Sequence, residues 1–496
     1  MNTARTGEIL GARITRDSVA AGGESYDLIV VGGGIYGAML ALESARRGLH
    51  PLLLERDDFG GATSWNSHRI VHGGLRYLQS LDFKRFAESV RERSWFLRHF
   101  PELVQPLSCL MPLYGQGARR PSVLRAALLA NHLLSRNRND GLRPDRVLEP
   151  GGVMTRRETI SLFPDVRQKR LCGGALWYDA VMTDSQRLLI EVLRWACANG
   201  ATCLNYVEAT DLRTGSEGVT GVEAVDRTTG SELTFNAPLV INCAGPWCRE
   251  VAACFDRDLE RLFQPSLAFN ILFDRQPASE AALAISAPGT GTHTWFLYGR
   301  GGRIYVGTGH HPWDGDSADL QPRHDQVDEM IESINAAAPK LDLRRHQILR
   351  IYAGLLPVTA ARSTDLVTEP LIHEHGKHGG PAGLYSVSGV KYTTSRDVAE
   401  RTLRAALGDT LAEPDPEMTQ RPTPASVPRL DDVRRLAESS GHEAVRERLA
   451  ELAKEEAVVQ ADDLLLRRTS WGEDPEIAAA LSPTIEELLP ETSRLR

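Results

Sequence analysis

A glycine-rich turn between two apolar runs, within residues 26–55, constrains the fold of this chain more than any other stretch. Residues 26–31 are apolar and rich in branched side chains, as in a buried parallel strand. A turn spaced G-x-G-x-x-G follows, at Gly32, Gly34 and Gly37. A helical pattern follows and ends at Gly48, and a second apolar run over 51–54 leads to Glu55. This order predicts a strand–turn–helix–strand unit.

Each part of this unit has a physical role in holding a dinucleotide. Gly32 permits the tight turn, Gly34 lets the backbone approach a pyrophosphate, and Gly37 lets helix and strand pack closely. The N-terminus of the helix faces the anion, and Ile35, next to Gly34, is expected to contact the cofactor. Glu55 lies where an acid accepts hydrogen bonds from a ribose. An ordinary glycine-rich turn would explain the glycines but not the placed acid, so we expect dinucleotide binding.

Composition narrows the class of protein. The chain has 496 residues, enough for two or three domains, and its 42% hydrophobic and 25% charged residues are typical of a globular protein. Its net charge of −8 gives no general affinity for nucleic acid. The seven cysteines form no C-x-x-C pair, which argues against a zinc site or a disulfide framework. We expect reduced thiols, no bound metal and a cytoplasmic protein.

The first 25 residues are polar and rich in glycine and alanine. They lack the apolar segment of a signal peptide, and we expect a flexible leader. No apolar run in the chain reaches the ~18–20 residues that span a bilayer.

The stretch after Glu55 is dense in hydroxyl groups and small residues. It begins with Arg56 and continues through a polar loop with Thr63, Ser64 and Ser67. A paired-glycine turn with a following cation then comes at His72, Gly73, Gly74, Leu75, Arg76 and Tyr77. A surface loop explains the polar residues, but not the apolar stretch that follows with its paired glycines and cation.

Residues 31–78 resemble the FAD-dependent glycerol-3-phosphate dehydrogenases of the D-amino acid oxidase-like flavoprotein superfamily. The family pattern is G-G-G-I-x-G-A, then A-T-S-x-x-S-x-K-x-x-H-G-G-L-R-Y-L, and this chain differs mainly in having Arg69 at the usual lysine. The resemblance implies that the dinucleotide is FAD rather than NAD. It also implies that the residues of the polar loop and the paired-glycine turn bind this cofactor.

Two later stretches resemble the other cofactor signatures of the family. A strand leads into Ala244, Gly245 and Trp247, similar to I-N-A-[AT]-G-P-W. Residues 384–407 resemble the closing signature G-G-K-x-T-T-x-R, with Gly389, Lys391, Tyr392 and Thr393, and a helix is expected from near Thr393. The N–H groups of that helix would face the flavin and stabilise negative charge on the reduced ring.

We therefore expect an α/β protein with three parts. A Rossmann-like FAD-binding domain would comprise residues 26–100, 146–264 and 350–410, with two strands over 204–235. An antiparallel-sheet substrate domain would comprise 101–145 and 265–349. Prolines mark a linker from about residue 411, followed by a short helical C-terminal domain that resembles the family text A-x-D-x-L-x-R-R-T near 461–472.

One helix has a pattern suited to a membrane surface. Residues 121–136 are amphipathic and are flanked by Arg119, Arg120, Arg125, Arg136 and Arg138. A basic amphipathic helix can lie on an anionic membrane, and packing between domains would explain the same pattern. In the resembled family, membrane contact serves electron transfer to quinone. Peripheral contact with the inner face of the membrane is therefore one expectation.

The resemblance fails in the half of the protein that holds the substrate. The family has S-G-[VL]-R-P-L, whose arginine binds the substrate phosphate, whereas this chain has Leu356 at the arginine position. A second family arginine, in I-T-R-D, is replaced near Glu369, which would repel phosphate. The K-G-S-H segment becomes residues 267–270, and G-T-T-D becomes residues 307–311, with gain of His310 and His311.

These changes predict a flavin-dependent oxidoreductase with an altered substrate. It would oxidise a CH–OH group of a small polyol or hydroxy compound and pass electrons to quinone or oxygen. Arg76 and Lys391 are expected to contact a polar or anionic part of the substrate, Tyr77 to hydrogen-bond it, and His310 or His311 to accept the proton.

Three alternatives remain open on the sequence alone. The first is true glycerol-3-phosphate dehydrogenase activity, with phosphate held by Arg76, Arg300 or Arg362. The second is oxidation of an amine or amino acid, and the third is a flavin-bound protein without catalysis. The identity of the electron acceptor is not specified by these patterns, and a homodimer is compatible with them.

Overall fold

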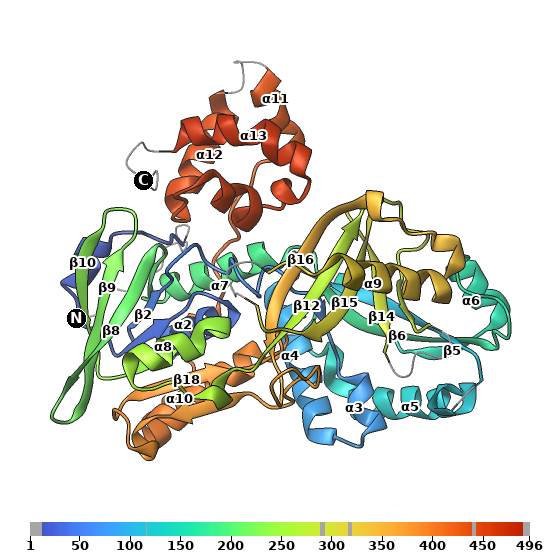
Figure 1. Ribbon diagram of the computed structural model, residues 1–496, viewed down its shortest axis with the longest axis horizontal. Helices are drawn as coiled ribbons and strands as arrows, with labels where there is room; N and C mark the ends of the chain where they lie inside the picture. Colours follow the sequence, from blue (N-terminus) through green and yellow to red (C-terminus); the bar gives the residue numbers. More distant parts are fainter. Residues whose placement is uncertain (1–11, 116, 288–292, 316–319, 439–442, 490–496) are drawn as a thin grey trace.

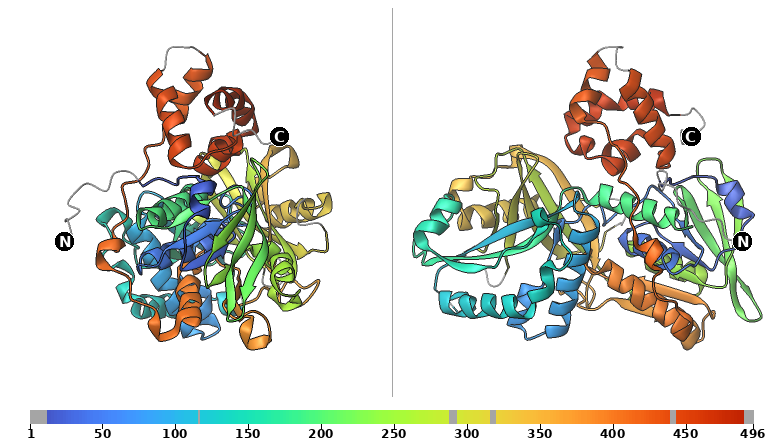
Figure 2. Two further views of the ribbon diagram at one scale, coloured as in Figure 1. Left: turned by 90° about the vertical axis from the view of Figure 1, so that its left-hand side faces the viewer. Right: turned by 180° about the vertical axis from the view of Figure 1, so that it is seen from behind.

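The computed structural model describes residues 12–115, 117–287, 293–315, 320–438 and 443–489. Two large sheets lie side by side, and a group of helices from the end of the chain stands above both (Figures 1 and 2). The first sheet holds the glycine-rich turn. The second forms the wall that faces it.

The first sheet has six strands in the order β17-β18-β11-β1-β2-β7, parallel except for β17 at one edge. Its strands are β1 (Leu28–Val31), β2 (Pro51–Leu54), β7 (Thr202–Leu204), β11 (Val240–Asn242), β17 (Leu371–Glu374) and β18 (Leu384–Ser388). Its two faces are covered differently because side chains alternate along each strand. Leu28, Val30 and Leu53 pack under helices, whereas Ile29, Val31 and Leu52 face a small antiparallel sheet.

The covering elements are α2 (Ile35–Ala45), α7 (Ser185–Ala198) and α10 (Ser395–Leu407) on one face. The other face carries β8 (Val207–Gly215), β9 (Gly218–Asp226) and β10 (Ser231–Asn236), with α8 (Cys248–Phe255) beside them. The expectation of two strands over 204–235 was therefore wrong. The segment holds a three-stranded meander, and residues 202–204 extend the parallel sheet.

The second sheet has nine strands, eight of them in the order β16-β12-β15-β14-β13-β4-β6-β3, with β5 paired to β6. They are β3 (Ile70–Val71), β4 (Val104–Leu113), β5 (Gly152–Thr155), β6 (Gly173–Met182), β12 (Pro265–Phe273), β13 (Ala282–Ile285), β14 (Trp295–Arg300), β15 (Arg303–Pro312) and β16 (Ile348–Pro357). Pairs are antiparallel except β13 with β4. Helix α9 (His324–Ala337) contributes to the apolar core on one face of this sheet.

Sheet membership differs from the expected domain boundaries. Strands β3, β5, β6 and β16 lie in the nine-stranded sheet, although residues 70–71, 152–182 and 350–357 were assigned to the FAD-binding domain. A ten-residue antiparallel ladder joins β6 to β4. Alternation of apolar and polar side chains predicts that a segment is a strand, but not which strand it pairs with. The boundary between the two domains could therefore not be predicted from this pattern.

The remaining helices complete the three parts. They are α1 (Ser18–Gly22), α3 (Leu75–Gln79), α4 (Phe83–His99), α5 (Pro121–Leu134) and α6 (Arg156–Leu162), and, in the C-terminal domain, α11 (Leu430–Glu438), α12 (Glu443–Glu455) and α13 (Pro475–Leu488). A π-helical turn at Asp463–Arg468 connects α12 towards α13. None of the helices in the described ranges is long and apolar enough to cross a membrane.

The expected flexible leader is wrong for its second half. Ile14 is fully buried, and Arg16 forms an ion pair of 2.6 Å with Asp226. Ser18 donates a hydrogen bond of 2.7 Å to the same carboxylate. The apolar side chain and the buried acid hold residues 12–24 against the protein, a consequence of partners about 200 residues away that local composition does not reveal. Residues 1–11 lie outside the described ranges.

Candidate active site

The turn between β1 and α2 leaves no room for side chains. Gly32 has a φ of +109°, and a Cβ there would lie 2.6 Å from the carbonyl oxygen of Cys243. A Cβ on Gly37 would lie only 1.9 Å from the carbonyl oxygen of Gly32. The helix therefore starts directly against the strand, and its N-terminus opens onto the space above the carboxyl ends of the parallel strands, where dinucleotides bind in such sheets.

Two side chains hold this turn. The Gly33 N–H donates to Glu55 Oε2 at 2.7 Å, and the Asp57 N–H donates to Glu55 Oε1 at 2.9 Å. Burial raises the pKa of Glu55 to about 7. The two backbone hydrogen bonds lower this pKa, but their effect is smaller than that of burial. Ser64 Oγ accepts from the Ile35 N–H at 3.0 Å, which places the polar loop at the start of α2.

The second signature lies against the first. A Cβ on Gly32 would be 2.9 Å from Cα of Ala244, and Gly245 takes a φ of +55°. The guanidinium of Arg56 lies 4.4 Å from the ring centroid of Trp247. Arg56, which directly follows Glu55, thus contacts the second signature through Trp247.

The closing signature reaches the same helix from the other side. A Cβ on Gly389 would lie 2.5 Å from the Tyr36 hydroxyl, and that hydroxyl donates to the carbonyl oxygen of Lys391 at 3.2 Å. Tyr392 donates to the carbonyl oxygen of Ser185 at 3.0 Å, and Thr393 is buried. The following helix, α10, begins at residue 395, two residues later than expected. The three signatures therefore converge at the start of α2.

The loop of residues 58–69 spans the gap between the two large sheets. Thr63 Oγ1 donates to the carbonyl oxygen of Leu355 at 3.1 Å, and a Cβ on Gly354 would lie 3.2 Å from Thr63. Asn270 Nδ2 donates to the carbonyl oxygen of Asn66 at 2.9 Å. One face of β12 and β16 therefore looks onto this loop, hereafter the cofactor loop.

The paired-glycine turn is organised by a buried acid that sequence inspection missed. Asp179 accepts from the Gly73 N–H at 2.7 Å and from Arg93 at 3.0 Å, and it lies 3.2 Å from His72 Nδ1. Burial alone would raise the pKa of Asp179, but His72, Arg93 and the Gly73 amide hold it at about 2. Its one sequence signal is a carboxylate inside the apolar strand β6. His72 and Gly73 are thus held by the protein itself.

Three cations surround Tyr77. The guanidinium groups of Arg76 and Arg85 lie 5.6 and 5.0 Å from its ring centroid, and the ammonium of Lys391 lies at 4.7 Å. Arg76, Tyr77, Ser80 and Arg85 line an open pocket. The structure therefore brings together Arg76, Tyr77 and Lys391, which the sequence predicted as contacts for the substrate.

Acidic side chains adjoin this cationic cluster. Lys391 also lines a small cavity with Tyr36, Glu88 and Glu369. Burial, followed by the charges of Asp397 and Glu369, raises the pKa of Glu88. The Val367 N–H donates to the carbonyl oxygen of Pro357 at 3.1 Å, which brings the end of β16, with Leu356, next to the segment that carries Glu369.

The two neighbouring histidines lie on opposite faces of β15. His310 pairs across the sheet with Ala268, which itself pairs with Gly354, so all three share the face covered by the cofactor loop. Ser266 and Leu356 belong to the same face, and Ser266 Oγ lies 2.6 Å from His310 Nε2.

His311 instead stacks on Phe269, with ring centroids 5.9 Å apart and an angle of 14°. Phe269 belongs to the apolar core that includes α9. Phe269 and His311 therefore face away from the cofactor loop, which argues against the role expected for His311 as a base.

The two other arginines considered as phosphate ligands, Arg300 and Arg362, pair with acidic residues. Arg300 is buried and pairs with Glu473 of the C-terminal domain, so it is not available to hold a phosphate. Arg362 is 78% exposed and lies 3.4 Å from Asp314.

The residues around the glycine turn fit an FAD molecule. Ser67 Oγ, the Gln186 amide and Ser388 Oγ are buried without a hydrogen-bond partner in the described part of the chain. Gln186 lies beside Gly60 of the cofactor loop, and Ser388 directly precedes Gly389. Unpaired buried polar atoms are costly, and the many donors and acceptors of FAD would satisfy them. The described residues contain no cluster of three or more side chains that could hold a metal ion.

A parallel sheet with a glycine-rich turn, a buried acid at the end of the second strand and a facing antiparallel sheet are together typical of a flavoprotein oxidoreductase. Residues 27–395 match the sequence model of the family "FAD dependent oxidoreductase". The chain is 32% identical over 411 residues to a glycerol-3-phosphate dehydrogenase of Synechocystis, covering 80% of this chain and 73% of that one. It is also 32% identical to glycerol-3-phosphate dehydrogenase 1 of Mycobacterium bovis, covering 80% and 76%. The chain belongs to the FAD dependent oxidoreductase family and is homologous to these dehydrogenases; it is an FAD-dependent enzyme.

Solved structures share the fold. A glycerol-3-phosphate dehydrogenase from Bacillus halodurans complexed with FAD superposes with a TM-score of 0.68, 23% identity and coverage of 95% of this chain and 90% of that one. A glycine oxidase from Geobacillus kaustophilus has a TM-score of 0.54, 17% identity and coverage of 79% and 99%. The expected fold class is confirmed, including the helical C-terminal domain.

The close approach of α2 to the strand yields a first prediction. Replacement Gly37→Ala places a methyl group against the Gly32 carbonyl, displaces the start of α2, and should weaken FAD binding at least about tenfold, or 1.4 kcal/mol. The measurement is the flavin absorbance per protein after gel filtration. Gly152→Ala is the control, because a Cβ there has nothing within 4 Å. Full flavin content in Gly37→Ala would contradict this account of the turn.

Proposed function

We propose that this enzyme oxidises a CH–OH group of a small polyol or hydroxy compound that carries no phosphate. The observation that carries the proposal is that Glu369 and Lys391 line the same cavity, next to the end of β16 that contains Leu356. A carboxylate repels a dianionic phosphate, and leucine offers it no charge or hydrogen bond. A hydroxyl group, in contrast, can donate to Glu369 and accept from Lys391.

The chain supplies the groups that bind and orient such a substrate. Arg76 and Lys391 would contact its polar end, and the hydroxyl of Tyr77 between them would donate a hydrogen bond. When bound, FAD accepts the hydride that leaves the substrate carbon. The proton of the substrate hydroxyl would pass to His310. Burial, followed by the charge of His311, lowers the pKa of His310 to about 4, so its imidazole is neutral at pH 7 and has a lone pair for that proton.

Two observations favour a second candidate, true glycerol-3-phosphate dehydrogenase activity. The curated relatives named above carry that name, and three cations gather at Tyr77. In this case Arg76 and Arg85 at the open pocket would hold the phosphate, because Arg300 is already paired. Oxidation of an amino acid is a third candidate, with the substrate carboxylate on Arg76.

Anaerobic bleaching of the flavin absorbance distinguishes these candidates. We expect glycerol, other polyols or hydroxy acids to bleach the flavin at concentrations at which glycerol 3-phosphate does not. Leu356→Arg should then lower the concentration of glycerol 3-phosphate needed for half-maximal bleaching about tenfold or more, because a charged hydrogen bond contributes about 1.5–3 kcal/mol. Leu356→Met is the matched control. Rapid bleaching of the unaltered enzyme by glycerol 3-phosphate would overturn the proposal in favour of the second candidate.

Replacing each of the two neighbouring histidines in turn tests whether His310 is the proton acceptor. His310→Asn should slow anaerobic flavin reduction by about 10²–10⁴-fold, the usual contribution of a general base, with whichever substrate bleaches the flavin. His311→Asn, one residue away on the opposite face, should leave the rate nearly unchanged. Stopped-flow absorbance measures both rates. Equal rates in the two variants would remove His310 from this role.

We also propose that the protein binds the surface of an anionic membrane through α3 and α5. These helices contact one another, and Figure 1 shows them at the same edge of the molecule. Apolar side chains stand exposed there, namely Leu81 (72%), Phe83 (54%), Leu129 (59%), Leu133 (62%) and Leu134 (54%). Arg120, Arg125 and Arg136 are exposed around them.

Two of the five expected arginines do not belong to this surface. Arg119 donates to Ser286 and Thr294, and Arg138 is buried. The pocket with Arg76 and Tyr77 lies on α3, at the edge of the apolar surface. A quinone dissolved in the membrane could therefore reach the flavin side of the protein over a short path, and oxygen is the alternative acceptor.

Vesicle sedimentation tests the membrane proposal. The double replacement of Leu129 and Leu133 by Gln should lower binding to vesicles with anionic lipid at least about tenfold, because each buried leucine contributes about 1.5–3 kcal/mol. Val19→Gln is the control, since Val19 is 76% exposed on α1. Binding that is unchanged in the double variant would contradict this surface, as would the absence of binding by the unaltered protein.

A further inference from the structure

The C-terminal domain forms ion pairs with both ends of the cofactor loop, at Asp58 and at Arg69. A single segment of that domain, residues 467–473, supplies Arg467, Arg468 and Glu473, the charged side chains that bind the two ends. The loop between the grips, residues 58–69, contains Thr63, Ser64 and Ser67, which the cofactor signatures place on FAD. We propose that this segment is a clamp that holds the cofactor loop in the conformation that binds FAD, so that Arg467, Arg468 and Glu473 act as positioning residues for the cofactor.

The first grip is on Asp58, three residues after Glu55. Arg468 donates to both carboxylate oxygens of Asp58, at 2.6 and 2.8 Å, and Arg467 Nε donates at 2.8 Å. Asn205 adds a hydrogen bond of 2.9 Å. Arg468 is fully buried and Asp58 is 2% exposed, so the two residues form a buried ion pair.

This grip is transmitted to the glycine turn. The Gly61 N–H donates to the carbonyl oxygen of Asp58, and the Gly60 N–H donates to the carbonyl oxygen of Gly33 at 3.0 Å. Gly33 lies inside G-x-G-x-x-G and its own N–H is bound to Glu55. Fixing Asp58 therefore fixes the backbone between the ribose-binding acid and the start of α2.

The second grip is on Arg69. Glu473 forms an ion pair of 2.9 Å with Arg69, which is 1% exposed, and also pairs with Arg300 of β14. The backbone carbonyls of Gly472 and Glu473 accept from Arg350 of β16, at 2.7 and 3.2 Å. The end of the clamp is thus anchored to the nine-stranded sheet, and the far end of the cofactor loop is tied to that anchor.

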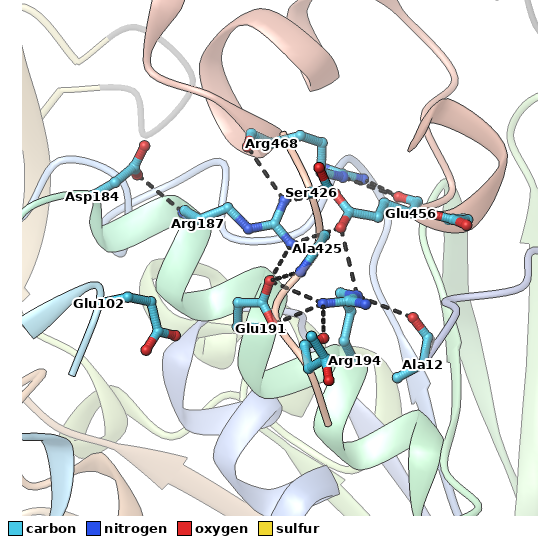
Figure 3. Close-up of polar contacts among 12 residues, drawn as sticks. Ala12, Glu102, Asp184, Arg187, Glu191, Arg194, Ala425, Ser426, Glu456 and Arg468 are labelled. Carbon is cyan, nitrogen blue, oxygen red and sulfur yellow. Dashed lines mark hydrogen bonds and ion pairs between the residues drawn. The ribbon is translucent and has the colours of Figure 1, made fainter. Parts of the chain in front are cut away.

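A second ion network joins the same domain to α7 and meets the clamp through backbone carbonyls. Arg468 donates to the carbonyl oxygen of Glu456 at 2.8 and 2.9 Å, and Arg187 donates to the carbonyl oxygen of Arg468 at 3.3 Å. Arg187 pairs with Glu456 at 2.6 Å and with Glu191 at 2.8 Å (Figure 3). Arg194 pairs with Glu191 and also donates to the carbonyl oxygens of Ala12 and Thr423. Its side chain is 3% exposed. This network supplies the control: it has similar burial and similar charge, and it ties the C-terminal region to the rest of the chain.

The test measures retention of FAD and loop mobility in the intact holoprotein. Arg468→Gln and Glu473→Gln should speed FAD release after dilution, followed by the fluorescence of free flavin, by about 5–150-fold, the usual range of coupling between two sites. Amide hydrogen exchange should accelerate within residues 58–69. Arg194→Gln should change FAD release by less than about twofold, because the hydrogen bonds that it removes go to Ala12, Glu191 and Thr423 and not to Asp58 or Arg69.

Circular dichroism at the working temperature shows which variants remain folded. If Arg468→Gln does not fold, Glu473→Gln and the milder Arg467→Gln decide the matter, because Arg467 is partly exposed and Asp58 keeps its other partners. The clamp is overturned if folded variants retain FAD as the unaltered protein does. It is equally overturned if Arg194→Gln releases FAD as fast as the clamp variants, which would mean that the domain contributes stability alone.

Discussion

The structure depends on the contact between the start of α2 and the turn that precedes it. Gly37 lies so close to the Gly32 carbonyl that only hydrogen fits between them. This contact sets the direction of α2 and leaves its N-terminus open at the carboxyl ends of β1 and β2. The second and third signatures then pack against the same few residues, through Ala244 on one side and Gly389 on the other. The cofactor site is therefore the meeting point of three segments, and a displacement of α2 would disturb all of them.

Much of this arrangement follows from short-range patterns. Strand, turn and helix positions near Gly32, Ala244 and Gly389 could be predicted because glycine spacing and apolar runs act over a few residues. The side of the sheet that a given side chain faces could not be predicted from such patterns. Whether His310 or His311 faces the cofactor loop depends on the register of β15 with β12, which pairs His310 with Ala268, a residue distant in the sequence. A shift of one residue would exchange the two histidines.

Long-range ion pairs were the other feature that local patterns did not reveal. Nothing near Asp58 in the sequence indicates that it is buried against two arginines, and the apolar strand around Asp179 does not reveal its partner Arg93. Their partners come from the C-terminal domain and from α4, and charged residues at such positions resemble any solvated polar residue until the fold is known. The same applies to Arg300, whose charge is neutralised by Glu473. Electrostatic complementarity between distant segments has no period along the chain, whereas helices and strands do.

The ion-pair partners of the cofactor loop are made much later in translation than the loop itself. Asp58 and its arginine partners are 409 and 410 residues apart, and Arg69 and Glu473 are 404 apart. At about 5–20 residues per second, a ribosome completes the loop roughly 20–80 s before it makes the partners of that loop. The nascent chain therefore carries Asp58 and Arg69 without their counter-charges for that period. A chain truncated before residue 467 would contain every cofactor signature but would lack these partners of Asp58 and Arg69.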